Sequence, residues 1–198
     1  MAIVYPYKKD LYVNLTNRCT ADCLFCIKKK WAYQYRGYNL RLEKEPTAGE
    51  IIRAIGDPAK YKEIVFCGYG EPFLRRTILV KVSRWLKKRA AKIRINTNGQ
   101  GNLIAGKNIL PELAGLIDEI SVSLNAGNAD DYERICRPKW GKKTFSAVID
   151  FIREAKKFIP KVTITAVKLP GLTREEECRK LAKKLGAAFR SRPYLGEE

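Results

Sequence analysis

The amino-acid sequence predicts an α/β protein whose sheet is mainly parallel and forms a partial, six-unit βα barrel. Short runs rich in β-branched and aromatic residues alternate with longer segments of helical apolar periodicity. Consecutive βα units of this kind form a parallel sheet with right-handed crossovers. The 198 residues are fewer than the roughly 250 that a closed eight-unit barrel takes. We therefore expect an open barrel, with functional residues just after the carboxyl ends of its strands.

Six short segments have the composition of buried strands, and the last of them is the weakest. The predicted strands are 11–15, 63–67, 92–96, 119–124, 161–167 and 187–190. Between them, two capping boxes predict helix starts, one at Thr47 and Glu50 and the other at Thr173 and Glu176. The other predicted helical segments are 78–86, 111–117 and 145–158.

The composition excludes several kinds of catalysis. The chain has 39 Lys and Arg against 21 Asp and Glu, a net charge of +18, and no His. A Ser-His-Asp or Cys-His site and a histidine general base are therefore ruled out. Cysteine, carboxylates, lysine, tyrosine or a bound cofactor would have to carry any chemistry. The scarcity of Gln and Met beside abundant Lys, Arg and Glu indicates a heat-adapted source.

The chain shows no signal-peptide pattern and no apolar run near the roughly 20 residues that span a bilayer. We therefore expect a cytoplasmic monomer without a membrane partner. In that compartment thiols stay reduced, so clustered cysteines indicate metal binding rather than disulfides.

Three cysteines, Cys19, Cys23 and Cys26, follow the first predicted strand directly. Thiolates so close in sequence can converge on one metal centre, and soft sulfur ligands select zinc, cuprous copper or an iron–sulfur cluster. A structural zinc site needs a fourth ligand, which without histidine would be one of the more distant cysteines. A cubane iron–sulfur cluster also normally takes four cysteines, so three would leave one iron open to another ligand.

The spacing C-x3-C-x2-C, with Phe25 before the last cysteine, resembles the signature of the radical S-adenosylmethionine (radical SAM) superfamily. The resemblance implies an oxygen-sensitive four-iron four-sulfur cluster on the three cysteines. S-adenosylmethionine would chelate the fourth iron and be cleaved reductively to methionine and a 5′-deoxyadenosyl radical, which abstracts hydrogen from a substrate. A zinc knuckle is the alternative interpretation of the spacing.

A second motif, Gly68, Tyr69, Gly70 and Glu71 followed by Pro72, comes after the second predicted strand. It resembles the family's Gly-Gly-Glu-Pro loop with Tyr69 inserted. Glycines let a backbone approach a ligand closely, and exposed carbonyls with a carboxylate can hold an ammonium group. The alternative is an ordinary Gly-Pro turn at a strand end.

Further polar and apolar candidates stand at the ends of the later strands. These are Asn96, Asn98, Ser121, Ser123, Asn125, Leu169 and Tyr194. The resemblance implies that Ser123 and Asn125 contact the ribose of S-adenosylmethionine, and that the regions of Leu169 and Tyr194 contact its adenine. Each residue type is also common in turns or strands, so their joint placement is the informative observation.

Nearly the whole chain takes part in a narrower resemblance, to the TatD-associated (TatD-linked) radical SAM proteins. The segments that carry it are 11–26, 65–72, 94–103 and 111–126. It implies a single radical SAM core domain over residues 1–198, without the auxiliary cluster domain of peptide-modifying relatives. The name of that group records an association rather than a reaction, so the substrate stays open among small metabolites, nucleobases in RNA and peptide or protein side chains.

The other three cysteines are scattered. Cys178 lies on an apolar helical stripe and Cys67 ends a strand, so we expect both to serve packing. Cys136 lies between Arg134 and Arg137, whose charges would lower a thiol pKa and favour a nucleophile or hydrogen donor. Burial without a catalytic role is the alternative for Cys136.

Segment 28–41 interleaves cations with aromatic residues. This pattern suits an acidic electron donor of the flavodoxin or ferredoxin type, a nucleic acid, or a loop that covers the open side of the barrel. Because Lys and Arg are spread over all the longer predicted helices, the net charge alone does not favour nucleic acid. The alternative function is a non-catalytic iron–sulfur or zinc module that binds nucleic acid or transfers electrons.

Overall fold

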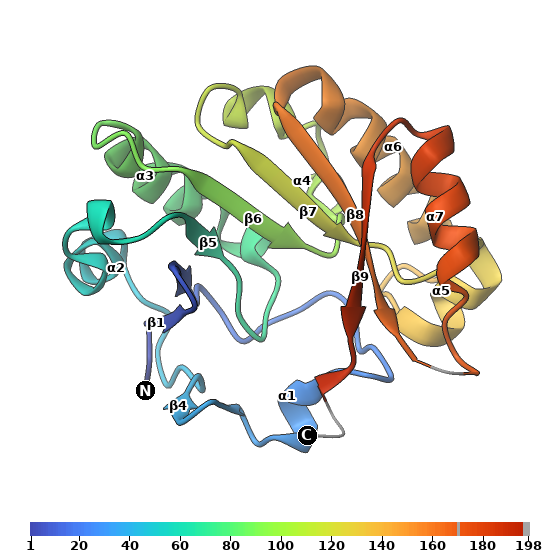
Figure 1. The fold of residues 1–198 in the computed structure, drawn as a ribbon, viewed down its shortest axis with the longest axis horizontal. Helices are drawn as coiled ribbons and strands as arrows, with labels where there is room; N and C mark the ends of the chain where they lie inside the picture. The colour runs from blue at the N-terminus through green and yellow to red at the C-terminus, as the bar shows by residue number, and fades with distance from the viewer. Residues whose placement is uncertain (170, 196–198) are drawn as a thin grey trace.

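A computed structural model describes residues 1–169 and 171–195 and contains a curved, open sheet (Figure 1). The strands follow the order β1-β2-β5-β6-β7-β8-β9, in which β1 is antiparallel to β2 and every other neighbouring pair is parallel. The strands of this sheet are β1 (Val4–Tyr7), β2 (Asp10–Val13), β5 (Ile64–Phe66), β6 (Ile93–Thr97), β7 (Glu119–Ser123), β8 (Lys161–Lys168) and β9 (Ala188–Pro193). The six parallel strands are the six predicted ones, and the open partial barrel is confirmed.

Helices cover the outer side of this sheet, and residues 27–39, which include α1 and β4, lie on the opposite side (Figure 1). The longer helices are α2 (Ala48–Ile55), α3 (Arg76–Lys87), α5 (Ala129–Cys136), α6 (Lys143–Phe158) and α7 (Glu175–Lys184). The shorter elements are α1 (Ile27–Lys30), the hairpin β3 (Gln34–Tyr35) and β4 (Tyr38–Asn39), α4 (Gly101–Ala105), and the 3-10 turns Pro58–Lys60, Pro72–Arg75 and Leu110–Leu113. None of the helices described here has the length and apolar character that a bilayer crossing requires.

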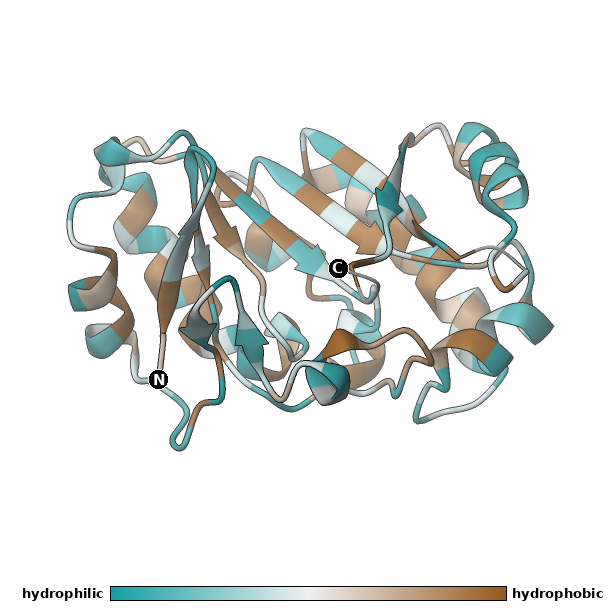
Figure 2. Cartoon of the chain, turned by 60° about the horizontal axis from the view of Figure 1, so that its bottom comes forward, coloured by the Kyte–Doolittle hydropathy of each residue, from teal (hydrophilic) through white to brown (hydrophobic). Residues whose placement is uncertain are grey.

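The alternation of residues along the strands separates an apolar from a polar face. Phe66, Ile95 and Ile120 are paired neighbours in the sheet and are completely buried in the core under the helices. The inner face carries polar residues such as Asn96 and Ser123. Figure 2 shows this alternation as brown and teal bands along the strands. A cavity lies against this inner face, so it can accommodate a ligand.

The capping box of α2 is confirmed, whereas the one predicted for α7 is wrong. Thr47 Oγ1 accepts from the Glu50 amide at 3.3 Å, and Glu50 Oε2 accepts from the Thr47 amide at 2.7 Å. Helix α7 instead has Arg174 at its N-cap, without a side-chain cap. The Thr173 hydroxyl donates to the Val167 carbonyl at 2.7 Å and closes the loop after β8.

The helix predicted over 111–117 is also wrong, because only the single turn Leu110–Leu113 forms there. Gly115 follows with φ +70°, a left-handed conformation that ends the helical path. Strand β1 was not predicted because Pro6 interrupts its apolar run. Pro6 is tolerated because β1 is an edge strand, where a missing ladder donor does no harm.

We predict that Thr47→Ala lowers the free energy of unfolding by about 1 kcal/mol, because it removes the cap of α2. The matched control is Thr77→Ala, an exposed position in the first turn of α3 that caps no helix. Urea denaturation of the two variants checks the prediction. Equal stability of both variants would contradict it.

Candidate functional site

Cys19, Cys23 and Cys26 all line one cavity of about 520 Å³ on the inner face of the sheet. The cysteines lie on the loop that leaves β2; Cys19 is exposed and the other two are partly buried. Phe25 lines the same cavity and packs against the core. Within residues 1–169 and 171–195, no three Cys, Asp or Glu side chains are gathered around a single-ion position. The argument that these residues could bind an iron–sulfur cluster therefore rests on their chemistry, since three thiols, which are soft ligands, share one cavity.

The loop Gly68–Glu71, which follows β5, packs against the base of the cysteine loop. The Glu71 amide donates to the Arg18 carbonyl at 2.8 Å. A Cβ at Gly70 would lie 2.2 Å from the Thr16 carbonyl oxygen, and a Cβ at Gly68 would be equally close to a side-chain atom of Asn14. Only glycine permits this approach. The glycines therefore hold the two loops together, in addition to any approach to a ligand.

The Glu71 carboxylate is buried and bonded within the protein. It accepts from the Thr97 hydroxyl at 2.8 Å and from the amides of Asn98 at 2.8 Å and Phe73 at 3.1 Å. Burial raises the pKa of Glu71 to about 7. A carboxylate has about four acceptor sites, so roughly one is left for a donor in the cavity, which Glu71 also lines.

Asn98 and Asn96 both reach the cavity from β6 and its end. The Asn98 amide group donates to Thr20 Oγ1 at 3.0 Å and lies 3.8 Å from Cys19 Sγ, a distance compatible with an N–H···S bond. Asn96 Oδ1 accepts a hydrogen bond from Arg94 at 2.8 Å, and the Asn96 side chain is also hydrogen-bonded to Cys67. Asn98 is therefore a hydrogen-bond donor to the cysteine loop.

Ser123 and Asn125 line the cavity, whereas Ser121 is buried beside it. Asn125 Oδ1 accepts from the Val167 amide at 3.1 Å, and its Nδ2 donates to the Ser123 carbonyl at 3.2 Å. Asn125 also has φ +61°, so its side chain stabilises a left-handed turn after β7. The amide group predicted to contact ribose is thus largely engaged by the protein.

After β9, Tyr194 lines the cavity as predicted for this region. Near the end of β8, Val167 lines the cavity and Leu169 is not among the residues that line it. Hydrogen bonding of the Leu169 amide to Thr173 Oγ1 at 3.0 Å turns the chain away after β8. Tyr69 also lines the cavity, and its hydroxyl donates to the Gln34 carbonyl at 2.7 Å.

Cys136 is buried at the end of α5, lines the cavity and is hydrogen-bonded to Cys23. This bond and burial raise the pKa of Cys23 well above its usual value. Cys67 lines the cavity, and Cys178 is completely buried on α7, as expected for packing.

The surroundings of Cys19 and Cys26 also favour their protonated thiols. Although Cys19 is exposed as a residue, desolvation of its thiol by the groups around it, together with the Glu71 charge, raises the pKa of Cys19 to about 11. Burial raises the pKa of Cys26. A metal must therefore displace protons when it binds.

Three cavity-lining arginines were not predicted: Arg94, Arg190 and Arg192. Arg94 forms an ion pair with Glu63 at 2.7 Å. The other two belong to β9, whose predicted extent ended at residue 190. Continued alternation of side chains through 193 was the signal that could have identified Arg192.

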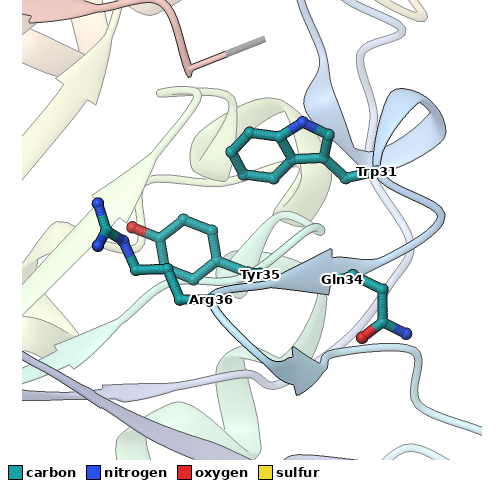
Figure 3. A pocket seen from close by; sticks show the side chains of 4 residues that line it. All are labelled: Trp31, Gln34, Tyr35 and Arg36. Carbon is teal, nitrogen blue, oxygen red and sulfur yellow. The ribbon is translucent and has the colours of Figure 1, made fainter. Parts of the chain in front are cut away.

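A second hollow, of about 450 Å³, is lined by Trp31, Gln34, Tyr35 and Arg36 (Figure 3). The rings of Trp31 and Tyr35 stack with centroids 5.9 Å apart, and the Arg36 guanidinium lies 5.8 Å from the Tyr35 ring centroid. The basic, aromatic segment 28–41 thus forms a small ordered surface next to the cysteine loop.

Residues 13–183 match the sequence model of the Radical SAM superfamily, so the chain belongs to this superfamily of enzymes. It is 30% identical over 121 residues to the tungsten-containing aldehyde ferredoxin oxidoreductase cofactor-modifying protein of Pyrococcus furiosus, with 59% of this chain and 31% of that protein covered. It is 27% identical over 133 residues to a probable GTP 3′,8-cyclase of Methanocaldococcus jannaschii, with 65% and 40% covered. The chain thus spans between 31% and 40% of the length of these curated relatives.

Solved structures share the fold at low sequence identity. TYW1 with a bound lysine-pyruvate adduct has a TM-score of 0.65 at 16% identity, with 94% of this chain and 65% of that chain covered. Streptococcus suis SuiB bound to S-adenosylmethionine gives the same TM-score and identity, with 95% and 41% covered. These similarities support the partial barrel of the radical SAM type.

We predict that Gly70→Ala lowers the free energy of unfolding by at least about 2 kcal/mol, because the new methyl group overlaps backbone atoms of the cysteine loop. The control is Gly49→Ala in α2, where a Cβ meets only Arg53 at 3.6 Å. Removing a helical glycine should stabilise by up to about 1 kcal/mol. Urea denaturation tests both variants, and a neutral Gly70→Ala would contradict the close packing.

We also predict that Glu71 makes stability depend on pH. The pKa of Glu71 rises from 4.5 to about 7 on folding. The contribution of Glu71 to the free energy of unfolding is therefore fully present below pH 4.5 and is lost as pH rises through 7. The Glu71→Gln variant has no titratable group at this position. Its stability relative to wild type should therefore improve by about 3 kcal/mol between pH 4.5 and 7.5. Denaturation of iron-free protein across this range measures the change, and a pH-independent difference would contradict it.

Proposed function

We propose that this chain is the core of a radical SAM enzyme that binds a four-iron four-sulfur cluster through Cys19, Cys23 and Cys26. S-adenosylmethionine would occupy the fourth iron. The observation that carries the proposal is that the three thiols and the loop Gly68–Glu71 line one cavity and are joined through the 2.8 Å bond from Glu71 to Arg18. Enzymes of the superfamily generally use this cluster and this cofactor.

Cys19, Cys23 and Cys26 would hold a cluster that, when bound, would supply the electron for reductive cleavage of S-adenosylmethionine and so the radical chemistry on the substrate. The residues of the chain position these groups and exclude water. The Asn98 amide supports Cys19, since donors beside a ligand sulfur tune a metal centre. The carbonyls of Gly68–Gly70 and the remaining acceptor site of Glu71 would hold the ammonium group of the cofactor.

The other cofactor contacts follow from the cavity lining. Ser123 offers a hydroxyl to the ribose, and Val167 and Tyr194 offer apolar surface to the adenine. Asn125 and Glu71 act mainly as positioning residues, because their own side chains are bonded within the protein. Homolytic cleavage requires no general base, so Glu71 need not exchange a proton during the reaction.

We further propose that an acidic electron donor of the flavodoxin or ferredoxin type docks on segment 28–41. Members of the superfamily commonly receive electrons from such proteins. The segment begins two residues after Cys26, and complementary charge mainly accelerates association. Nucleic acid is the second candidate for this surface.

A cytoplasmic location and a monomeric state stay predictions.

The narrower assignment to the TatD-associated group, and a single core domain over residues 1–198, are likewise proposals. They are supported by the sequence segments that carry the resemblance. The curated relatives are named as a cofactor-modifying protein and a probable cyclase, and the chain spans less than half of either.

Metal analysis tests the proposed function. We predict that anaerobically purified protein is brown and holds close to four irons with equal sulfide, as one cluster requires. Cys19→Ala, Cys23→Ala and Cys26→Ala should each lose most of this iron. Cys178→Ala is the control, because its sulfur is buried on α7 away from the cavity.

Colourless wild-type protein with one stoichiometric zinc would contradict the proposal and favour the non-catalytic module. Full iron content in the Cys19, Cys23 and Cys26 variants would show that the ligands are wrong.

A further inference from the structure

Two arginines of β9 face the cavity. Phe189 packs against the core, with the Arg179 guanidinium 4.8 Å from its ring centroid. Arg190 and Arg192, later in the same strand, line the cavity. Their spacing of two residues puts both side chains on the same face of the strand. The two guanidinium groups therefore lie side by side along the inner edge of the barrel.

Both arginines reach across β8 to serines of β7. Arg190 donates to Ser121 Oγ and Arg192 donates to Ser123 Oγ, each at 3.3 Å. The repeated contact fixes the direction of both side chains into the cavity. Each guanidinium has five N–H groups, so a single serine contact leaves most of its donors free for a ligand.

The charge of this pair is not compensated within the described part of the chain, where no carboxylate lies within 4 Å of either guanidinium. By contrast, Arg94 in the same cavity pairs with Glu63 at 2.7 Å and with Asp10 at 3.8 Å. The carboxylate that lines the cavity, Glu71, is already engaged by three donors. The cavity therefore carries an excess of positive charge at β9.

Arg192 also has a buried donor without a partner. Among the described residues its Nε makes no hydrogen bond. Burial and the neighbouring Arg190 charge lower the pKa of Arg192, as expected for a guanidinium whose charge no carboxylate balances. A bound anion would supply the acceptor for Nε and remove the repulsion between the two cations.

We propose that Arg190 and Arg192 bind an oxyanion group of the substrate, and that this group is a phosphate. Guanidinium groups match oxyanions through paired N–H···O bonds. Two adjacent positive charges match a phosphate dianion better than a single carboxylate. This inference rests on the proposed function, since it places a phosphorylated substrate in the cavity that the cluster and S-adenosylmethionine share.

The test is a calorimetric titration of the cluster-loaded protein with inorganic phosphate at fixed ionic strength. We expect the double substitution Arg190→Gln and Arg192→Gln to weaken phosphate binding at least tenfold. The control is Arg53→Gln with Arg84→Gln, which removes the same charge from exposed positions on α2 and α3 and should change the affinity less than twofold. Arg190→Lys with Arg192→Lys keeps the charge but loses the paired N–H donors of the guanidinium groups, and should give an intermediate phosphate affinity.

Equal weakening in the control would overturn the inference, because it would show general attraction to a protein of charge +18. Displacement of phosphate by S-adenosylmethionine would also overturn it, because the pair would then belong to the cofactor. Acetate binding as tight as phosphate binding would contradict the phosphate assignment. Iron and sulfide content, measured on the same samples, reports separately on the proposed function.

Discussion

The packing of Gly70 and Glu71 against the cysteine loop is the contact on which the rest of the site depends. The Glu71 amide holds Arg18, the residue before Cys19, while its carboxylate holds Thr97 and Asn98 at the end of β6. One residue therefore joins the loops after β2, β5 and β6. The burial of a carboxylate is unfavourable, and its three hydrogen bonds offset this only in part, since its pKa stays raised.

This arrangement gives the cavity its two ends. The cysteines and the glycine loop lie on the side of β2 and β5, where Asn98 supports Cys19. The other side is formed by β8 and β9, where the cavity lining changes to Val167 and the two arginines. The polar inner face of the sheet makes both ends possible, because the apolar residues of the same strands are directed to the helices. The cluster and the ammonium group of the cofactor would thus be held on the side of β2 and β5. The proposed ribose and adenine contacts, Ser123, Val167 and Tyr194, lie on the same side as the two arginines, so the substrate anion would be bound next to that part of the cofactor.

Local patterns explain how much of this was predictable from the sequence. The strand runs and the Thr47 capping box depend on neighbouring residues alone, and the structure confirms them. The contact between Cys23 and Cys136 joins distant parts of the chain and has no local signal. Thr173 satisfied the capping pattern but bonds to Val167 instead, because its hydroxyl closes the loop after β8 rather than the first turn of α7. Arg192 was expected only within a segment of backbone contacts to adenine, because the predicted strand ended at residue 190, whereas β9 continues through Pro193 and directs the Arg192 side chain into the cavity.

The proposed function requires that the cavity bring an electron and S-adenosylmethionine together at the three cysteines. The most direct measurement is the release of 5′-deoxyadenosine from S-adenosylmethionine by anaerobic, chemically reduced protein that carries its full iron content. Our account predicts release that requires both the reductant and the iron. Protein that holds four irons and binds S-adenosylmethionine, yet releases no 5′-deoxyadenosine on reduction, would contradict it.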